Sequence, residues 1–303
     1  MNALGAFMRW PESGAVFSLL GVIAFFVIVG SVDLMRLAGA ASWVNFAANL
    51  GIVAIPLGLL MIIGELDISI GAMIPVGSMS TAIVSGYYWM PIAVGMAAAT
   101  EFGVLVGLVN GILTVRTSVP SLIVTLGTLV AMHGIVLAGA VLLTGAASVP
   151  LVSPPSTKFV FGQLIGGSHQ VIIVWWIASA SLLTFVVHFS PFGAWLFAMG
   201  GDKQSARNAG IPVRGVTIAL FVLSACSASF VGMCQAILFN SAQVSGGMGF
   251  IFNAIVSQGI YFTSMDRNWS NLIIGILLLI AVAMNEAFRK LALNYRPSKP
   301  AKA

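Results

Sequence analysis

Long runs of apolar residues constrain the fold of this chain more than any other feature. Eight runs match the length of about 17 to 25 residues that a helix needs to cross the hydrocarbon core of a bilayer. They cover residues 15–32, 44–63, 71–88, 91–115, 121–143, 171–189, 216–239 and 271–288. Charged residues make up only 7% of the 303 residues, whereas a soluble domain carries about 25%. The sequence therefore predicts an all-α integral membrane protein, a polytopic helical bundle of about eight spans.

The positions of the positive charges predict how the bundle is oriented. If the N-terminus is cytoplasmic and each run crosses once, ten of the thirteen Lys and Arg residues lie on the cytoplasmic side, as the positive-inside rule requires. Both termini are then cytoplasmic, with a basic tail at 289–303. The net charge of +5 has the same explanation and indicates no nucleic-acid partner. A shorter apolar piece, 247–262, would invert the last span if it crossed fully, so we expect a re-entrant or half helix there.

Two longer loops separate the spans of what we expect to be a single transmembrane domain, residues 1–303. The outer loop, 144–170, is rich in Pro, Ser and Gly, which are residues typical of turns. The inner loop, 190–215, carries three of the positive charges and therefore belongs on the cytoplasmic side.

The inner loop also contains start and stop signals for a short helix. Asp202 is a suitable N-cap, Lys203 to Ala209 suit a helix, Gly210 stands where a C-terminal glycine cap belongs, and Pro212 prevents continuation. These signals predict a two-turn helix on the cytoplasmic face. An idle surface helix is the commoner meaning of such a pattern.

Two carboxylates, Glu65 and Asp67, lie between glycines in strongly apolar sequence. An uncovered charge inside a bilayer is costly, so intramembrane acids usually face a water-filled path or a partner. Both are therefore candidates for a translocation pathway, although a short loop at the membrane surface explains them about equally well. Glu101 stands alone within a long apolar run. The three acids together would suit an ion-coupled secondary transporter.

Motifs of enzymes and metal sites are absent from the sequence. It contains no Gly-x-x-x-x-Gly-Lys-Ser/Thr phosphate loop, and its three histidines are scattered. Cys226 and Cys234 are eight residues apart in one apolar run, which places them at helical spacing as packing residues. We therefore expect no enzyme activity, no metal site and no cofactor bound by this chain. If ATP is used, a separate subunit hydrolyses it.

Three sequence blocks follow one another in an order that is typical of one family. Residues 45–71 end in Gly-Glu-Leu-Asp-Ile-Ser-Ile-Gly, residues 110–128 contain Asn-Gly and Pro-Ser-Leu-Ile-Val-Thr-Leu-Gly-Thr, and residues 192–211 run from Phe-Gly through Gly-Gly-Asp to Gly-Ile. These blocks resemble those of the permease subunits of ribose-type bacterial ABC importers, with Asp202 where Asn is usual. The resemblance covers roughly residues 45–240.

The resemblance implies a multi-pass permease of the bacterial inner membrane that imports a sugar or sugar-like small molecule. Its implied partners are a cytoplasmic ATPase that binds ATP and Mg, a second permease subunit, and a periplasmic binding protein that delivers the sugar to the side of the 144–170 loop. A non-transporting membrane scaffold is a third possibility beside the importer and the secondary transporter. Pentoses, hexoses, polyols and furanosyl signalling molecules all suit a neutral polar path.

The resemblance also assigns roles to residues of this sequence. The short inner helix becomes a coupling helix that docks on the ATPase, through Gly201, Asp202, Ser205, Ala206, Arg207 and Gly210. A polar lining that hydrogen-bonds sugar hydroxyls would be formed by Glu65, Asp67, Ser69, Asn110 and Thr125. A structural role, satisfying the ends of broken helices, is about equally consistent with each of the lining residues.

The C-terminal part departs from the family pattern. Family members carry a glycine-rich Gly-Gly-Thr-Ser-x-x-Gly-Gly-x-Gly block followed by another span, whereas only residues 245–249 and a compressed segment precede the family-like run 271–288. We interpret this difference as an internal deletion. It leads us to expect a hetero-oligomer in which this chain pairs with a non-identical, full-length homologue.

Overall fold

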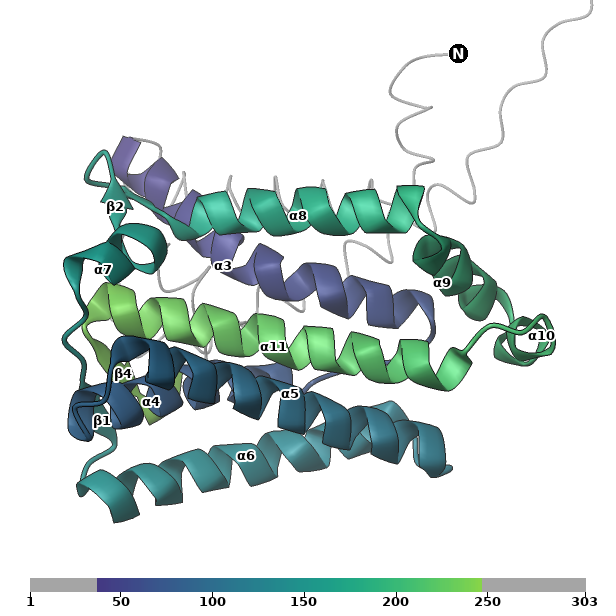
Figure 1. Ribbon diagram of the computed structural model, residues 1–303, viewed down its shortest axis with the longest axis horizontal. Helices are drawn as coiled ribbons and strands as arrows, with labels where there is room; N and C mark the ends of the chain where they lie inside the picture. Colours follow the sequence, from purple (N-terminus) through teal and green to yellow (C-terminus); the bar gives the residue numbers. More distant parts are fainter. Residues whose placement is uncertain (1–36, 247–303) are drawn as a thin grey trace, which may run out of the picture. The chain divides into compact units, whose positions relative to one another are not determined.

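The computed structural model describes residues 37–246 (Figure 1). Residues from Val44 onward belong to one compact unit, and residues 37–43, the start of the first described helix, belong to a second. The helices are α3 (Leu37–Ile62), α4 (Ile70–Ala82), α5 (Ile92–Arg116), α6 (Ser121–Thr144), α7 (Pro155–Phe161), α8 (Ile172–Phe189), α9 (Pro191–Gly201), α10 (Lys203–Asn208) and α11 (Val213–Phe239). A π-helical turn, η2 (Ile83–Tyr87), extends α4, and a 3-10 turn, η3 (Val244–Gly246), follows the last strand.

Six helices in the described part are long and apolar enough to cross a membrane, and they coincide with six of the predicted spans. They are Gly39–Ile62, Ile70–Tyr87, Ile92–Arg116, Ser121–Thr144, Ile172–Phe189 and Val213–Phe239. The predicted spans at 15–32 and 271–288, the half helix at 247–262 and most of the shortened glycine-rich block lie outside the described residues.

The core is built around α4, which is buried along almost its whole length between α5 and α11. Glycines allow these helices to approach closely. A Cβ atom on Gly232 of α11 would lie 1.9 Å from the carbonyl oxygen of Ile74 on α4, and one on Gly107 of α5 would lie 2.4 Å from the Cα of Val222 on α11. Without a hydrophobic driving force between helices in lipid, such close backbone contact is a main source of association.

Two helices leave most of their apolar surface uncovered. Only 17% of the α6 span and 6% of the α8 span are buried within the described part of the chain. A soluble protein rarely exposes apolar faces of this extent. The surfaces of α6 and α8 are therefore suited to lipid or to another membrane subunit.

Short strands outside the spans were not predicted by the all-helical interpretation. β1 (Ser148–Pro150) pairs antiparallel with β4 (Ser241–Gln243), and β2 (Leu164–Ile165) pairs with β3 (His169–Gln170). Together with α7 they make the 144–170 loop an ordered structure. Figure 1 shows these elements at one end of the bundle, and α9 and α10 at the other. The two are called below the strand end and the α10 end.

Candidate functional site

The connection between α3 and α4 interrupts helical structure inside the bundle. Gly64, at φ +75°, ends α3, and the N–H groups of Gly64 and Glu65 donate to the carbonyls of Met61 and Leu60 at 3.0 and 2.9 Å. These two bonds form the Schellman motif, in which a left-handed glycine is favoured. The chain then continues without helix or strand through residue 68, so its backbone groups need partners from elsewhere.

Hydroxyl groups on the first turns of α6 supply those partners. Ser121 Oγ accepts a hydrogen bond from the N–H of Leu66 at 3.1 Å, and Thr125 Oγ1 accepts one from the N–H of Ile68 at 3.2 Å. Residues four apart share one face of a helix, so the two hydroxyls match the two N–H groups of the extended chain. Irregular backbone is tolerated in a membrane protein where it is buried and satisfied in this way.

A chain of buried polar side chains continues from the connection into the bundle. Asp67 Oδ1 accepts hydrogen bonds from the N–H and the hydroxyl of Ser69, at 3.0 and 2.5 Å. Asn110 on α5 donates to Ser69 Oγ at 2.9 Å, and Thr128 on α6 donates to Asn110 Oδ1 at 2.6 Å. Asp67, Ser69 and Asn110 are each almost completely buried. We call Asp67, Ser69, Asn110 and Thr128 the polar cluster.

The polar cluster extends toward α11. The hydroxyl of Ser224 on α11 interacts with the Asp67 carboxylate as a hydrogen-bond donor, although neither this hydroxyl nor the second carboxylate oxygen of Asp67 makes a well-formed hydrogen bond in the described part. A buried polar atom without such a bond is costly. A small adjustment that brings the two groups together would satisfy both.

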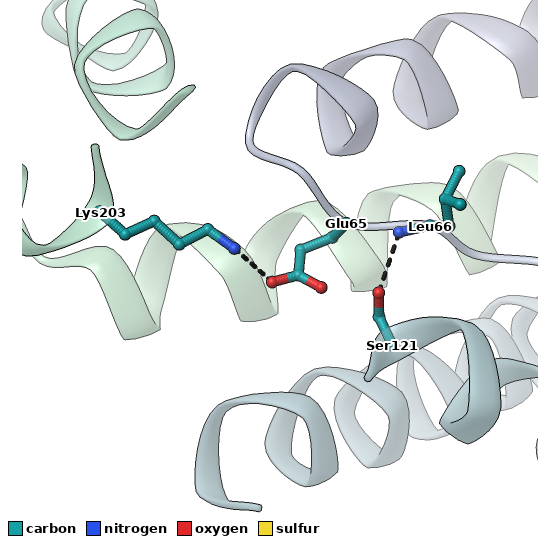
Figure 2. A network of polar contacts seen from close by, with 4 residues as sticks. All are labelled: Glu65, Leu66, Ser121 and Lys203. Atoms are coloured by element: carbon teal, nitrogen blue, oxygen red, sulfur yellow. Dashed lines mark hydrogen bonds and ion pairs between the residues drawn. The ribbon is translucent and has the colours of Figure 1, made fainter. Parts of the chain in front are cut away.

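Glu65 belongs to a different environment from Asp67. Its carboxylate forms an ion pair with the ammonium group of Lys203, the first residue of α10. Figure 2 shows Glu65 directed toward Lys203, while the N–H of the next residue, Leu66, is directed toward Ser121. Of the five predicted pathway residues, four therefore lie in or beside the polar cluster, and Glu65 lies at the α10 end.

The predicted caps of the short inner helix are confirmed. The carboxylate of Asp202 accepts hydrogen bonds from the N–H groups of Ser205 and Gln204 at 2.7 and 3.3 Å. Hydrogen bonds from Ser205, followed by the one from Gln204, hold the pKa of Asp202 below its ordinary value, because they stabilise the charged form. At the other end Gly210 has φ +86°, and the N–H of Ile211 donates to the carbonyl of Ala206 at 3.1 Å.

The α10 helix is anchored to the rest of the bundle by an apolar cluster. Its buried members come from α3, α9, α10 and α11 and nearby connections: Leu59, Leu60, Ile63, Leu196, Met199, Ala206, Val213, Val216, Leu220 and Phe221. Ala206 is therefore covered by this chain and is not free to contact a partner. Among the other predicted coupling residues, Gly201, Asp202, Ser205, Arg207 and Gly210 are exposed.

Sequence reasoning missed two features of this end. Helix α9 precedes α10, and Ser190 caps it by accepting a hydrogen bond from the N–H of Phe192 at 3.2 Å. The Ser-Pro pair at 190–191 is a helix-start signal that could have predicted it. Lys203 was not singled out as a site residue either, and no local signal could have paired it with a residue 138 positions away.

The cavities in the described part include two at the strand end that are larger than a few water molecules. The larger, about 730 Å³, is lined by His133, Leu137, Ala146, Ala147, Ser148, Gln243, Val244 and Ser245. A smaller cavity of about 230 Å³ is lined by Ile74, Ser78, Gln235, Ala236, Phe239, Ser241, Ala242 and Gln243. The larger volume falls in the range of about 300 to 1,000 Å³ that small-molecule sites occupy. None of the predicted pathway residues lines either cavity.

No group of three or more His, Cys, Asp and Glu side chains within residues 37–246 is arranged to hold a metal ion. Glu101 lies on the exposed face of α5. It stands nine residues from Asn110, or about 13 Å along a helix axis. It therefore does not join Asp67 in a cluster of acids.

Comparisons with known proteins give a consistent result. A family model described as "branched-chain amino acid transport system / permease component" matches residues 39–258. The fructose import permease protein of Rhizobium meliloti is 27% identical over 313 residues, covering 90% of this chain and 84% of that protein. A probable ABC transporter permease protein of Escherichia coli (strain K12) is 29% identical, covering 87% of this chain and 79% of that protein. The D-allose transport system permease protein of the same strain is 28% identical, with coverages of 72% and 66%. No solved structure matches.

Proposed function

The chain belongs to the family of permease components of branched-chain amino acid transport systems, and from this premise we propose that it is the permease subunit of an ATP-driven importer of a sugar or sugar-like small molecule. One observation carries the choice of substrate class. Relatives that cover most of this chain are named for fructose, L-arabinose and D-allose import. Branched-chain amino acids, which the family description names, are the second candidate.

We propose that the α10 end faces the cytoplasm. Arg116, Lys203, Arg207 and Arg214 lie at or next to this end, whereas Lys158 lies on α7 at the strand end. An excess of Lys and Arg on the cytoplasmic side is the usual bias of inner-membrane proteins. The strand end, with its cavities, then faces the periplasm.

The proposed orientation assigns a side to each partner. A separate ATPase subunit, which binds ATP and Mg, docks on the exposed residues of α10. A periplasmic binding protein delivers the sugar at the strand end, near the cavity lined by Ser148 and Gln243. A second permease subunit, a non-identical full-length homologue, covers part of the apolar surface of α6 or α8. Transport by a complex that contains only this permease would contradict the requirement for a non-identical partner.

Transport would follow from a shift between two states of the bundle. ATP binding favours the state whose α10 surface fits the closed ATPases, and this differential contact is all that the shift requires. Asp67, Ser69, Asn110 and Thr125 are buried and hydrogen-bonded here, so we propose that they meet the sugar in the other state. In the state described, Thr125 and Asp67 accept hydrogen bonds from backbone N–H groups of the α3–α4 connection, and Asn110 donates to the Ser69 hydroxyl.

An ion-coupled secondary transporter is not favoured by the family match. The three acids on which that hypothesis depended also lie apart from one another. Glu65 is paired with Lys203, and Glu101 is exposed on α5. The chain is a permease rather than an enzyme, which agrees with the prediction from the sequence.

Uptake by whole cells tests the proposed function. Cells expressing this permease with its neighbouring transport genes are given labelled fructose, arabinose, xylose, allose, leucine, isoleucine and valine in turn. We expect uptake of one or more sugars, lost when the ATPase is inactivated by mutation. Uptake of the amino acids alone would support the second candidate, and sugar uptake that persists with the inactive ATPase would overturn the proposal.

A further inference from the structure

The ion pair between Glu65 and Lys203 is unlike an ordinary surface pair. The side chain of Glu65 is 14% exposed and that of Lys203 is 38% exposed. Exposed ion pairs contribute little because water screens them, but Glu65 is largely removed from water. Loss of Lys203 would leave a mostly buried carboxylate without its partner, which is a costly state.

The pair joins α10 to a segment that is itself attached to two other helices. Leu66, next to Glu65, donates its N–H to Ser121 on α6 (Figure 2). Ile68 donates its N–H to Thr125, one turn further along the same helix. Through Ser69 the segment is also bonded to Asn110 on α5. A continuous series of polar contacts therefore runs from α10 through the connection to α6 and α5.

This segment is well suited to respond when α10 moves. Residues 65–68 form no helix or strand, so side chains from other helices supply much of their hydrogen bonding. A shift of these residues therefore changes hydrogen bonds to neighbouring helices and breaks none within a helix of their own. The apolar cluster around Leu196 and Ala206 also holds α10, but apolar contact is non-directional and permits sliding, whereas an ion pair and hydrogen bonds fix direction.

We propose that Lys203 is a positioning residue of the transport cycle, which acts through Glu65 to keep the α3–α4 connection in register with α10. Displacement of α10 then moves the start of α4, with the polar cluster, relative to α6. This inference rests on the proposed function, in which α10 receives the ATPase. It gives Glu65 a role in coupling, in place of the contact with sugar predicted from the sequence.

Charge reversal tests the inference in the complete complex of permeases, ATPase and binding protein, reconstituted in proteoliposomes. Lys203→Glu and Glu65→Lys are made singly and together, and sugar uptake and ATP hydrolysis are measured in the same vesicles. We expect each single reversal to lower the sugar imported per ATP hydrolysed about tenfold, within the range of about 5- to 150-fold typical of coupling between sites. The double variant, which restores an ion pair, should recover most of the loss.

A matched control places the same charges at the same end of the bundle, outside α10, without restoring the pair. Arg214, near the start of α11 at the α10 end, is exposed, is not one of the proposed docking residues and forms no ion pair with another described residue. Arg214→Glu combined with Glu65→Lys has the same net charge as the restoring double variant. The inference predicts that this combination stays uncoupled.

Other outcomes would overturn the inference. If the Lys203→Glu, Glu65→Lys double variant stays as impaired as the single variants while the complex assembles, the pair is not the link. If Lys203→Glu prevents the ATPase from co-purifying and the double variant does not restore it, Lys203 contacts the partner instead. Failure of the wild-type complex to import sugar with ATP would overturn the proposed function and the inference with it.

A neutral cycle serves if the charge-reversal variants fail to assemble. Lys203→Gln, Glu65→Gln and the double variant remove the pair without placing like charges together. Since both residues act through one contact, the inference predicts that the double variant is no worse coupled than either single variant. Additive losses would overturn it.

Discussion

The close approach of α4 and α11 makes a direct prediction about Gly232. A Cβ atom at this position would lie 1.9 Å from the carbonyl oxygen of Ile74 and 3.0 Å from the backbone nitrogen of Ser78. Both are backbone atoms, so no side chain can turn away. To reach the 3.0 Å below which real Cβ contacts are essentially never found, the two helices must separate by about 1.1 Å at this point.

The expected cost of Gly232→Ala follows from this separation. Overpacking a tightly packed core typically costs about 1 to 3 kcal/mol, and the gain in helix propensity from Gly to Ala returns up to about 1 kcal/mol. Because the clash is with backbone at the most buried helix, we expect a net loss of about 2 kcal/mol. A loss of that size lowers the midpoint of thermal unfolding by about 4 to 8 °C, by analogy with soluble proteins of 150 to 250 residues.

Thermal unfolding of the purified protein in detergent checks this prediction. Gly215→Ala on the same helix is the matched control, because a Cβ there meets no atom within 4 Å. We expect the control to unfold at the wild-type midpoint or slightly above it, since the helix propensity improves. Equal midpoints for Gly232→Ala and Gly215→Ala would refute the reasoning that α4 and α11 pack backbone to backbone here.

Three further predictions concern the site. Asn110→Ala removes the bonds to Ser69 and Thr128 and should cost about 1 to 3 kcal/mol of unfolding free energy in detergent. The control, Thr114→Val on the same helix, removes a buried hydroxyl with no partner in the described residues and should be neutral or stabilising. Equal losses in the two variants would contradict the hydrogen bonding of the polar cluster. Because the pKa of Asp202 is lowered in the folded state, its cap stabilises α10 when the pH is above the ordinary aspartate pKa of 3.8, and this stabilisation is lost as the pH falls through the lower folded pKa. Protease cleavage within α10 should therefore rise over that acidic range in the wild type. Asp202→Asn should abolish this pH dependence. Arg207→Glu, on the exposed side of α10, should weaken co-purification of the ATPase, and unchanged co-purification would remove this residue from the docking surface.

The spans and the caps were predictable from the sequence because both depend on local chemistry. Apolar runs specify helices in lipid whatever they pack against, so six runs became helices close to their expected ends. Asp202 and Gly210 satisfy backbone groups within their own turn, so their roles followed from their spacing. The orientation and the partners of α10 stay predictions.

Features that depend on contacts between distant segments were not predictable. β1 and β4 are three-residue strands that pair segments about ninety positions apart, and they are too short to show a strand period. The run 71–88 gave one span, but it did not reveal that residues 83–87 form a π-helical turn. The opposite environments of Glu65 and Asp67, only two residues apart, are set by α10 on one side and by α5 and α6 on the other.

The energy source of transport is the most direct test of the account. Proteoliposomes containing the permease complex are supplied with binding protein and labelled sugar on one side and ATP with Mg on the side of α10, with no ion gradient across the membrane. The account predicts that sugar accumulates against its gradient with ATP and not with a non-hydrolysable analogue. Accumulation driven by an imposed proton or Na⁺ gradient in the absence of ATP would contradict it.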